Sequence, residues 1–205
     1  MSKCKYLSYV IFHPLEGFDE MRHNKGVSFP LSMLLFCLFF LSVAFRQRYI
    51  GKQFAFIDET KMSLQTVFLS CAGLMLAVVC SNWAISVLLD GKARLKDIWI
   101  ILNYSLLPYT VFGYLYIIIS NIAISEEGAL LNIVLYIGII WSTVLVFRSL
   151  MSFQEFTFSK TFGSLVLTAI GVIIILFLAV LIYSLFQQLF GTLSTVFYEI
   201  TFRLK

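Results

Sequence analysis

Five long stretches without a charged residue constrain the fold of this chain more than any other feature. They lie at residues 26–45, 62–89, 98–125, 128–147 and 161–198. A helix of about 20 apolar residues is long enough to cross the hydrocarbon core of a bilayer. Each stretch is continuously apolar, whereas the strands of a membrane β-barrel alternate between apolar and polar residues. The sequence therefore predicts an all-α, polytopic membrane protein with five transmembrane helices.

The predicted organisation is a single membrane domain over residues 1–205, with an amphipathic segment at each end. We expect residues 1–27 to be cytoplasmic and to contain a short helix on the membrane surface, because apolar residues recur there at helical spacing. The last uncharged stretch is too long for one straight crossing, so we divide it at Gly191 and expect an amphipathic tail over 191–205. The five spans are expected at about residues 28–45, 63–89, 98–124, 129–147 and 162–190.

The few charged residues report topology. They make up 13% of the chain, against about 25% in soluble domains. If the N-terminus is cytoplasmic, nine of the 15 Lys and Arg residues lie on the cytoplasmic side and six outside. Since cytoplasmic loops carry an excess of Lys and Arg, the sequence predicts a cytoplasmic N-terminus and an external C-terminus. The basic residues are scattered over several connections, so we expect no nucleic acid partner.

Small residues mark a packing face on the second predicted span. Gly73, Ala77 and Ser81 follow one another at four-residue intervals. This spacing lets a second helix approach closely, which is a main packing device between helices in lipid. We therefore assign these three residues to a helix-packing groove.

A tight hairpin joins the second and third predicted spans. Gly91 is expected to end one helix in the left-handed conformation. Asp97 is expected to begin the next helix by capping its free N–H groups. Lys92, Arg94 and Lys96 lie between the two spans, where they can reach lipid phosphates.

A proline interrupts the third predicted span. Pro108 cannot donate a hydrogen bond to the carbonyl four residues back, so it frees the carbonyl of Tyr104. Counting from the hairpin, Asn82 and Tyr104 lie at the same depth, about 10 Å from its end at 1.5 Å per residue. We therefore expect the Asn82 amide to bind that carbonyl or the Tyr104 hydroxyl and to lock the hairpin. A ligand site at the kinked helix is the alternative.

The sequence contains none of the usual signatures of hydrolases, metalloproteases or nucleotide-binding proteins. None of the five stretches holds an acid, a basic residue or a histidine, which weighs against active transport by this chain alone. One face of the N-terminal helix carries two histidines and two glutamates: His13, Glu16, Glu20 and His23. These residues could hold a metal ion or form a solvated polar face, and we favour the polar face. We therefore expect no catalytic residue, no metal and no cofactor.

Several short motifs resemble the Yip (Ypt-interacting protein) domain family. The most specific of them lie in the hairpin, at residues 82–83, 89–92, 95–98 and 104–109, and residues 12–18 resemble the helix that precedes the first span in bacterial members. The resemblance implies a five-span membrane protein of the bacterial cell membrane, where such proteins often occur beside carbohydrate importers of the ABC class. The hairpin residues assigned structural or contact roles are Asn82, Trp83, Asp90, Gly91, Lys96, Asp97, Tyr104 and Pro108.

Three functions are compatible with these features. The first is a non-enzymatic membrane protein that binds lipids and other integral membrane proteins, for example as an accessory subunit of an ABC-type transporter, and that can also bind further copies of itself. The second is a passive channel or carrier for a small solute. The third is a membrane-shaping or GTPase-linked trafficking factor. We favour the first.

Overall fold

The computed structural model describes residues 9–11, 13–23, 28–50, 63–123 and 127–203, and its regular structure over these residues is α-helical. A short helix, α2 (Pro14–His23), precedes α3 (Phe29–Tyr49) and α4 (Leu64–Leu88). The third crossing consists of α5 (Leu95–Ser105) and α6 (Leu107–Ser120). The chain ends with α7 (Gly128–Gln154) and the very long α8 (Phe158–Arg203).

Five of these helical segments are long and apolar enough to cross a membrane, which confirms the predicted fold class. They are Phe29–Tyr49, Leu64–Leu88, Leu95–Ser120, Gly128–Gln154 and Phe158–Thr195. The helix ends differ from the predicted ones, because α3 continues past Arg46 and α7 continues past Arg148. A charged residue such as arginine ends the apolar stretch but has a high helix propensity. The helix can therefore continue out of the hydrocarbon core.

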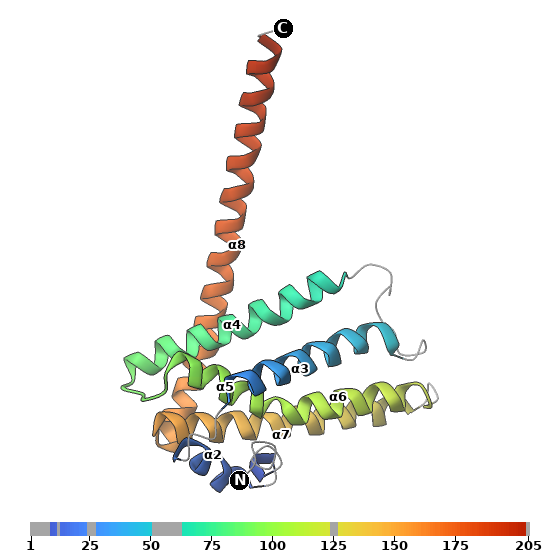
Figure 1. The fold of residues 1–205 in the computed structure, drawn as a ribbon, viewed down its shortest axis with the longest axis vertical. Coiled ribbons are helices and arrows are strands. Elements are labelled where there is room, and N and C mark those ends of the chain that lie inside the picture. Colours follow the sequence, from blue (N-terminus) through green and yellow to red (C-terminus); the bar gives the residue numbers. More distant parts are fainter. Residues whose placement is uncertain (1–8, 12, 24–27, 51–62, 124–126, 204–205) are drawn as a thin grey trace.

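The body of the molecule is built around α5 and α6. These two helices lie between α3 and α7, and α4 packs on α3 and α5 (Figure 1). All residues of α5 from Ile98 to Ser105 are buried. The third crossing is 61% buried over its most apolar stretch, whereas the corresponding values for the other four range from 6% to 28%. The third crossing is therefore the core of the body.

The N-terminal amphipathic helix exists, and its apolar face is turned toward protein. α2 packs on α7, and its Phe18 and Met21 side chains are fully buried. Because this apolar face is covered by α7, it is not free to insert into a membrane surface as predicted. Its polar face carries Glu16, Glu20 and His23, and His13 directly precedes the helix; all four are exposed. No cluster of metal ligands is found in the part of the chain that the structure describes.

α8 crosses the body and then leaves it. It packs mainly on α4, it meets α7 near its start, and its remainder extends beyond the other helices (Figure 1). The helix continues through Gly191 to Arg203, so the break that we placed at Gly191 is wrong. A single glycine lowers helix stability by only about 1 kcal/mol relative to alanine. No proline or turn sequence supports a break at this position.

The length of α8 exceeds what a direct crossing needs. Its apolar part, Phe158–Thr195, has 38 residues, which corresponds to about 57 Å at 1.5 Å per residue. The hydrocarbon core is only about 30 Å thick. α8 therefore either crosses the bilayer at a strong inclination or extends beyond it.

Candidate functional site

The hairpin turn between α4 and α5 is where most of the predicted site residues lie. α4 ends with a Schellman-type turn, in which the Gly91 N–H donates to the Ser86 carbonyl at 2.7 Å. The left-handed residue of this turn is Asp90, with φ of 57°, and not Gly91 as predicted. Aspartate tolerates this conformation because its short polar side chain can bond locally.

Gly91 is required for a different reason. A Cβ at this position would lie 2.4 Å from the Ser86 hydroxyl oxygen and 3.1 Å from the Ser86 carbonyl oxygen. The first distance is far below van der Waals contact and the second is tight, so a side chain at this position would force the turn and α4 to shift apart. Glycine is therefore favoured here by its close approach to α4 and not, as predicted, by a left-handed conformation.

Asp97 stabilises the start of α5. It is the third residue of the helix, which begins at Leu95, and its carboxylate accepts a hydrogen bond from the Arg94 backbone N–H at 3.1 Å. A negative side chain in the first helical turn is favourable because the helix dipole is positive there. The prediction that Asp97 begins the helix is therefore wrong by one turn: Arg94 is the N-cap, and Asp97 stabilises the first turn from its third position.

We expected Asn82 to bind Tyr104 or the carbonyl freed by Pro108, and this expectation is wrong. Asn82 faces α7 and α8 instead. Its amide nitrogen donates to the Thr168 hydroxyl of α8 at 3.0 Å, and its carbonyl accepts from the Gln154 amide at the end of α7 at 2.8 Å. Ser81 adds a hydrogen bond to the Thr168 carbonyl at 2.9 Å. All four residues are buried. The side chains of this network, Ser81, Asn82, Gln154 and Thr168, join α4, α7 and α8.

The helix break before Pro108 is stabilised by α7. α5 ends at Ser105 and α6 begins at Leu107. The Tyr109 N–H, close to the break, donates to the Ser142 hydroxyl at 2.9 Å, and the hydroxyls of Ser105 and Ser149 lie 3.2 Å apart. Ser142 and Ser149 are two helical turns apart on α7, so they present a polar edge to the broken helix.

Other predicted residues are divided between buried and exposed positions. Tyr104 and Pro108 are buried, whereas Trp83 is 41% exposed on α4. In the predicted groove, Ala77 and Ser81 are buried, and a Cβ on Gly171 of α8 would lie 2.2 Å from the Ser81 hydroxyl. Gly73 has open space around it, so the Gly73 end of the groove is not covered by α8.

A cluster of ion pairs fixes the corner between α7 and α8. Glu155 follows α7 with φ of 56° and pairs with both Arg22 of α2 and Lys92 of the hairpin. Arg22 also donates to the Ser152 carbonyl at 3.0 Å. The hydrogen bonds from Lys92 and then Arg22 lower the pKa of Glu155 to about 2. We call Arg22, Lys92 and Glu155 the corner cluster.

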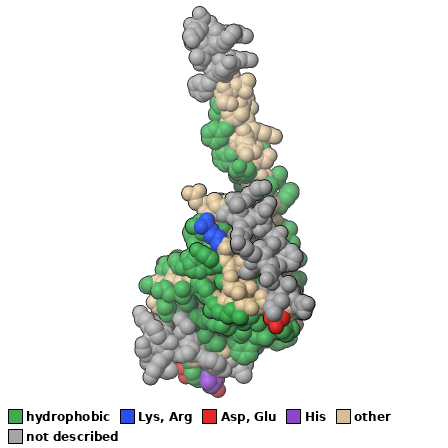
Figure 2. All heavy atoms as spheres, turned by 90° about the vertical axis from the view of Figure 1, so that its right-hand side faces the viewer, with side chains coloured by type: hydrophobic (Ala, Val, Ile, Leu, Met, Phe, Trp, Pro, Cys, Tyr) green, Lys and Arg blue, Asp and Glu red, His purple; other side chains and the backbone are tan. Residues whose placement is uncertain are grey.

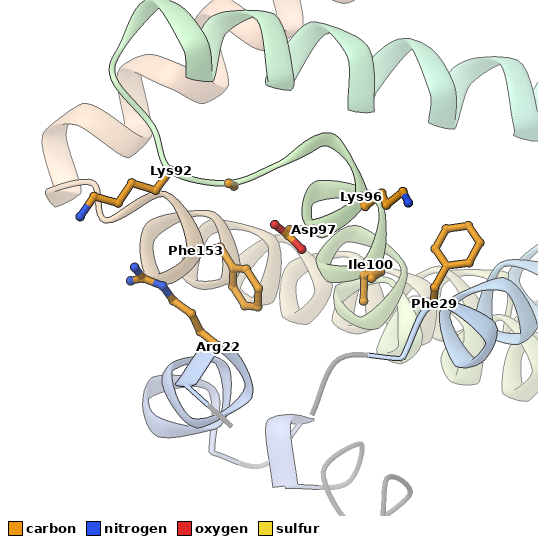
Figure 3. Close-up of a pocket in the computed structure, with 8 residues that line it drawn as sticks. Arg22, Phe29, Lys92, Lys96, Asp97, Ile100 and Phe153 are labelled. Carbon is orange, nitrogen blue, oxygen red and sulfur yellow. The ribbon is translucent and has the colours of Figure 1, made fainter. Parts of the chain in front are cut away.

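A pocket lies next to the corner cluster. Its volume is about 410 Å³. Figure 3 shows Arg22 and Lys92 at one end of it, Lys96 and Phe29 at the other, and Asp97 between them. The lining residues are Arg22, Phe29, Lys92, Ala93, Lys96, Asp97, Ile100 and Phe153. The pocket thus combines cationic side chains from α2, the hairpin and α5 with an apolar wall.

Sequence reasoning missed the partners of the predicted residues. Gln154 and Glu155 stood in a predicted connection, and Thr168 stood in a span with no assigned role. The spacing of Gly138, Ser142 and Ser149 on α7 is a small-residue signal of the same kind as the groove on α4. It points to the close approach of α6, because a Cβ on Gly138 would lie 2.7 Å from the Cβ of Phe112.

Comparison with known families supports the resemblance. The family model of the Yip1 domain matches residues 8–182. The chain belongs to the Yip1 domain family. No curated protein and no solved structure matches it.

The Yip1 domain includes the hairpin, the polar network, the corner cluster and the pocket. The match ends within α8 at residue 182. The remaining part of α8, as far as Arg203, lies outside the matched residues.

Proposed function

We propose that this chain is a non-enzymatic integral membrane protein that works by binding other membrane proteins through α8. The observation that carries the proposal is the exposure of outer α8, by which we mean residues 176–195. Every residue of outer α8 is exposed. Only 6% of the most apolar stretch of α8 is buried, so nearly all of its apolar surface remains available for contact.

Lipid can cover apolar side chains, but outer α8 also carries polar ones. Gln187 donates to the Tyr183 hydroxyl at 2.9 Å, and Gln188, Thr192 and Thr195 follow within two helical turns. Polar side chains on a membrane helix favour association with a second helix, because the partner supplies hydrogen bonds that lipid cannot supply. This combination favours a protein partner for outer α8.

Charged residues are sparse on the surface between the helix ends. Figure 2 shows hydrophobic side chains over much of the described body and along one side of α8. Among the described residues, the pocket and the corner cluster lie at the hairpin end of the body, away from outer α8. In this proposal the hairpin end holds the fold together, and outer α8 binds the partner.

The partner that we propose is the permease of an ABC-type carbohydrate importer, with this chain as an accessory subunit. The support is the resemblance to bacterial Yip domain proteins, which often occur beside such importers. In this proposal the chain lies in the bacterial plasma membrane with its N-terminus in the cytoplasm, as the distribution of Lys and Arg favours.

The test is purification of the full chain from its native membrane in mild detergent, with mass spectrometry of the proteins that accompany it. Recovery of a permease in stoichiometric amount supports the proposal. Recovery of no partner, together with solute flux in liposomes that contain the pure protein, contradicts it and identifies a passive channel.

A variant tests the role of outer α8. The double substitution Gln187→Leu and Gln188→Leu is expected to lower permease recovery about fivefold to tenfold, since interhelical hydrogen bonds in membranes contribute about 0.6 kcal/mol each. The matched control is Thr143→Val, which removes a polar group from an exposed position of α7. Equal losses in both variants would show that outer α8 is not the contact surface.

A further inference from the structure

The pocket at the hairpin end has the features of a site for an amphipathic anion. Its charged residues come from separate parts of the chain: Arg22 from α2, Lys92 from the hairpin, and Lys96 and Asp97 from α5 (Figure 3). The rest of its wall consists of Phe29, Ala93, Ile100 and Phe153. We propose that this pocket binds the phosphate headgroup of an anionic membrane phospholipid.

The charge of the pocket favours an anion. Three cationic side chains line it, and Asp97 is the acidic side chain among its lining residues. Glu155 neutralises part of the charge by pairing with Arg22 and Lys92, which leaves a net charge of about one positive unit when all five groups are ionised. The carboxylate of Asp97 already accepts the Arg94 N–H. Lys96 is in neither of the ion pairs that the described residues form, so its ammonium group is available for a phosphate.

The position of the pocket favours a lipid over a soluble phosphate. The pocket lies where α3 and α5 begin and where α7 ends, on one side of the predicted bilayer. Phosphate headgroups occupy this interfacial level. Lys and Arg side chains at helix ends readily extend toward that level.

Exposed apolar side chains of α3 lie next to the pocket and can contact acyl chains. Phe29, at the rim of the pocket, is 45% exposed, and Met33, one turn further along α3, is 39% exposed. Both lie on a helix that is long and apolar enough to span the membrane. A headgroup in the pocket therefore places its chains along α3, where they contact apolar side chains and not water.

The hairpin offers a matched pair of substitutions. Lys96→Gln removes a cationic group that lines the pocket, and Arg94→Gln removes one that is two residues away and is not among the lining residues. Both side chains are exposed, so neither change disturbs the core. The readout is native mass spectrometry of the full chain, titrated with phosphatidylglycerol, phosphatidylethanolamine, phosphatidylcholine or inorganic phosphate.

We expect selective retention of phosphatidylglycerol by the wild-type protein. Lys96→Gln should weaken this retention about fivefold, the effect of one cation near a lipid phosphate, whereas Arg94→Gln should change it by less than about twofold because the Arg94 side chain does not line the pocket. Equal losses in the two variants would overturn the pocket assignment. Displacement of the lipid by inorganic phosphate would assign the site to a soluble anion and contradict a lipid ligand. Preference for phosphatidylethanolamine would give the leading role to the Asp97 carboxylate and would also overturn the proposal.

Discussion

The hairpin end of the body and outer α8 differ in the hydrogen bonds that their polar side chains form. At the hairpin end, buried amides and hydroxyls join α4, α7 and α8, and the corner cluster ties α2 and the hairpin to the end of α7. In outer α8, the side-chain hydrogen bonds run within the helix, as from Gln187 to Tyr183. The difference indicates which region maintains the fold and which is available to a partner.

The physical basis of this difference is the cost of polar groups in lipid. A polar side chain inside the membrane needs a hydrogen-bond partner, because leaving it unpaired costs several kcal/mol. Asn82 obtains its partners from two other helices of the same chain. The side-chain amide of Gln188 lies in exposed outer α8, where a partner helix can supply hydrogen bonds. We therefore expect substitutions to have opposite consequences in the two regions.

The largest expected effect is that of Asn82→Leu at the hairpin end. This change removes both hydrogen bonds of the amide and leaves the buried Gln154 amide without its acceptor, whereas the Thr168 hydroxyl keeps its bond to the Ser164 carbonyl. A loss of about 2 to 3 kcal/mol in the free energy of unfolding is expected, since buried groups that lose their partners cost about 1 to 3 kcal/mol. The measurement is reversible unfolding in mixed detergent micelles.

The control for this comparison is Gln187→Leu in outer α8. Its expected effect on the free energy of unfolding is within about 0.5 kcal/mol, as for most exposed positions. If the two substitutions destabilised the protein equally, the distinction between the two regions would be wrong.

The second expected effect compares two glycines of α8. An alanine Cβ at Gly171 would lie 2.2 Å from the Ser81 hydroxyl oxygen, whereas at Gly191 it would meet open space. Gly171→Ala should therefore destabilise the protein by about 1 to 2 kcal/mol, the usual cost of overpacking. Gly191→Ala should stabilise α8 slightly, by up to about 1 kcal/mol, because alanine favours a helix.

Circular dichroism melts of both glycine variants in detergent measure this contrast. A stabilising effect of Gly171→Ala would mean that α4 and α8 separate readily at Ser81. A large destabilisation by Gly191→Ala would mean that outer α8 packs on something within the chain.

The smallest expected effect concerns the corner cluster and pH. The pKa of Glu155 is lowered from 4.5 to about 2 in the folded protein, so its contribution to stability is present above pH 4.5 and is lost as the pH falls toward 2. The Glu155→Gln variant should lack this part of the acid dependence. The side chain is largely exposed, so the shift in melting temperature is expected to be modest.

Melting temperatures between pH 6 and pH 3 provide the measurement, with Glu20→Gln as a control that removes an exposed acid outside the corner cluster. The curve of the Glu20 variant should follow that of the wild-type protein. A Glu155→Gln curve that also follows the wild type would show that the corner cluster contributes nothing to stability.

The number of spans could be predicted from the sequence, but their ends could not. Uncharged stretches mark the bilayer-crossing segments because charges are costly in lipid. They do not mark where a helix stops, since α7 continues past Arg148 to Gln154 and α8 continues past Gly191. Helix ends depend on turn geometry and tertiary contacts, which are not visible in composition.

The residue Asn82 was identified correctly as a buried polar contact, although its partners were not. Counting residues from the hairpin gives its depth in the membrane, but not the direction of its side chain around the helix axis. That direction depends on how α8, 86 residues further along the chain, crosses α4. For the same reason the pocket, which joins α2, α5 and the end of α7, is visible only in the folded structure.

During synthesis, α5 meets the membrane before α7 has been made. In the finished protein its residues Ile98 to Ser105 are buried, and the Ser105 hydroxyl lies 3.2 Å from that of Ser149 on α7. α3 and α4, which also pack on it, precede it in the chain and can receive it at once. The third crossing is therefore expected to reach its final packing only after the fourth has been inserted. The core of this protein thus forms after the helices on both sides of it are in the membrane.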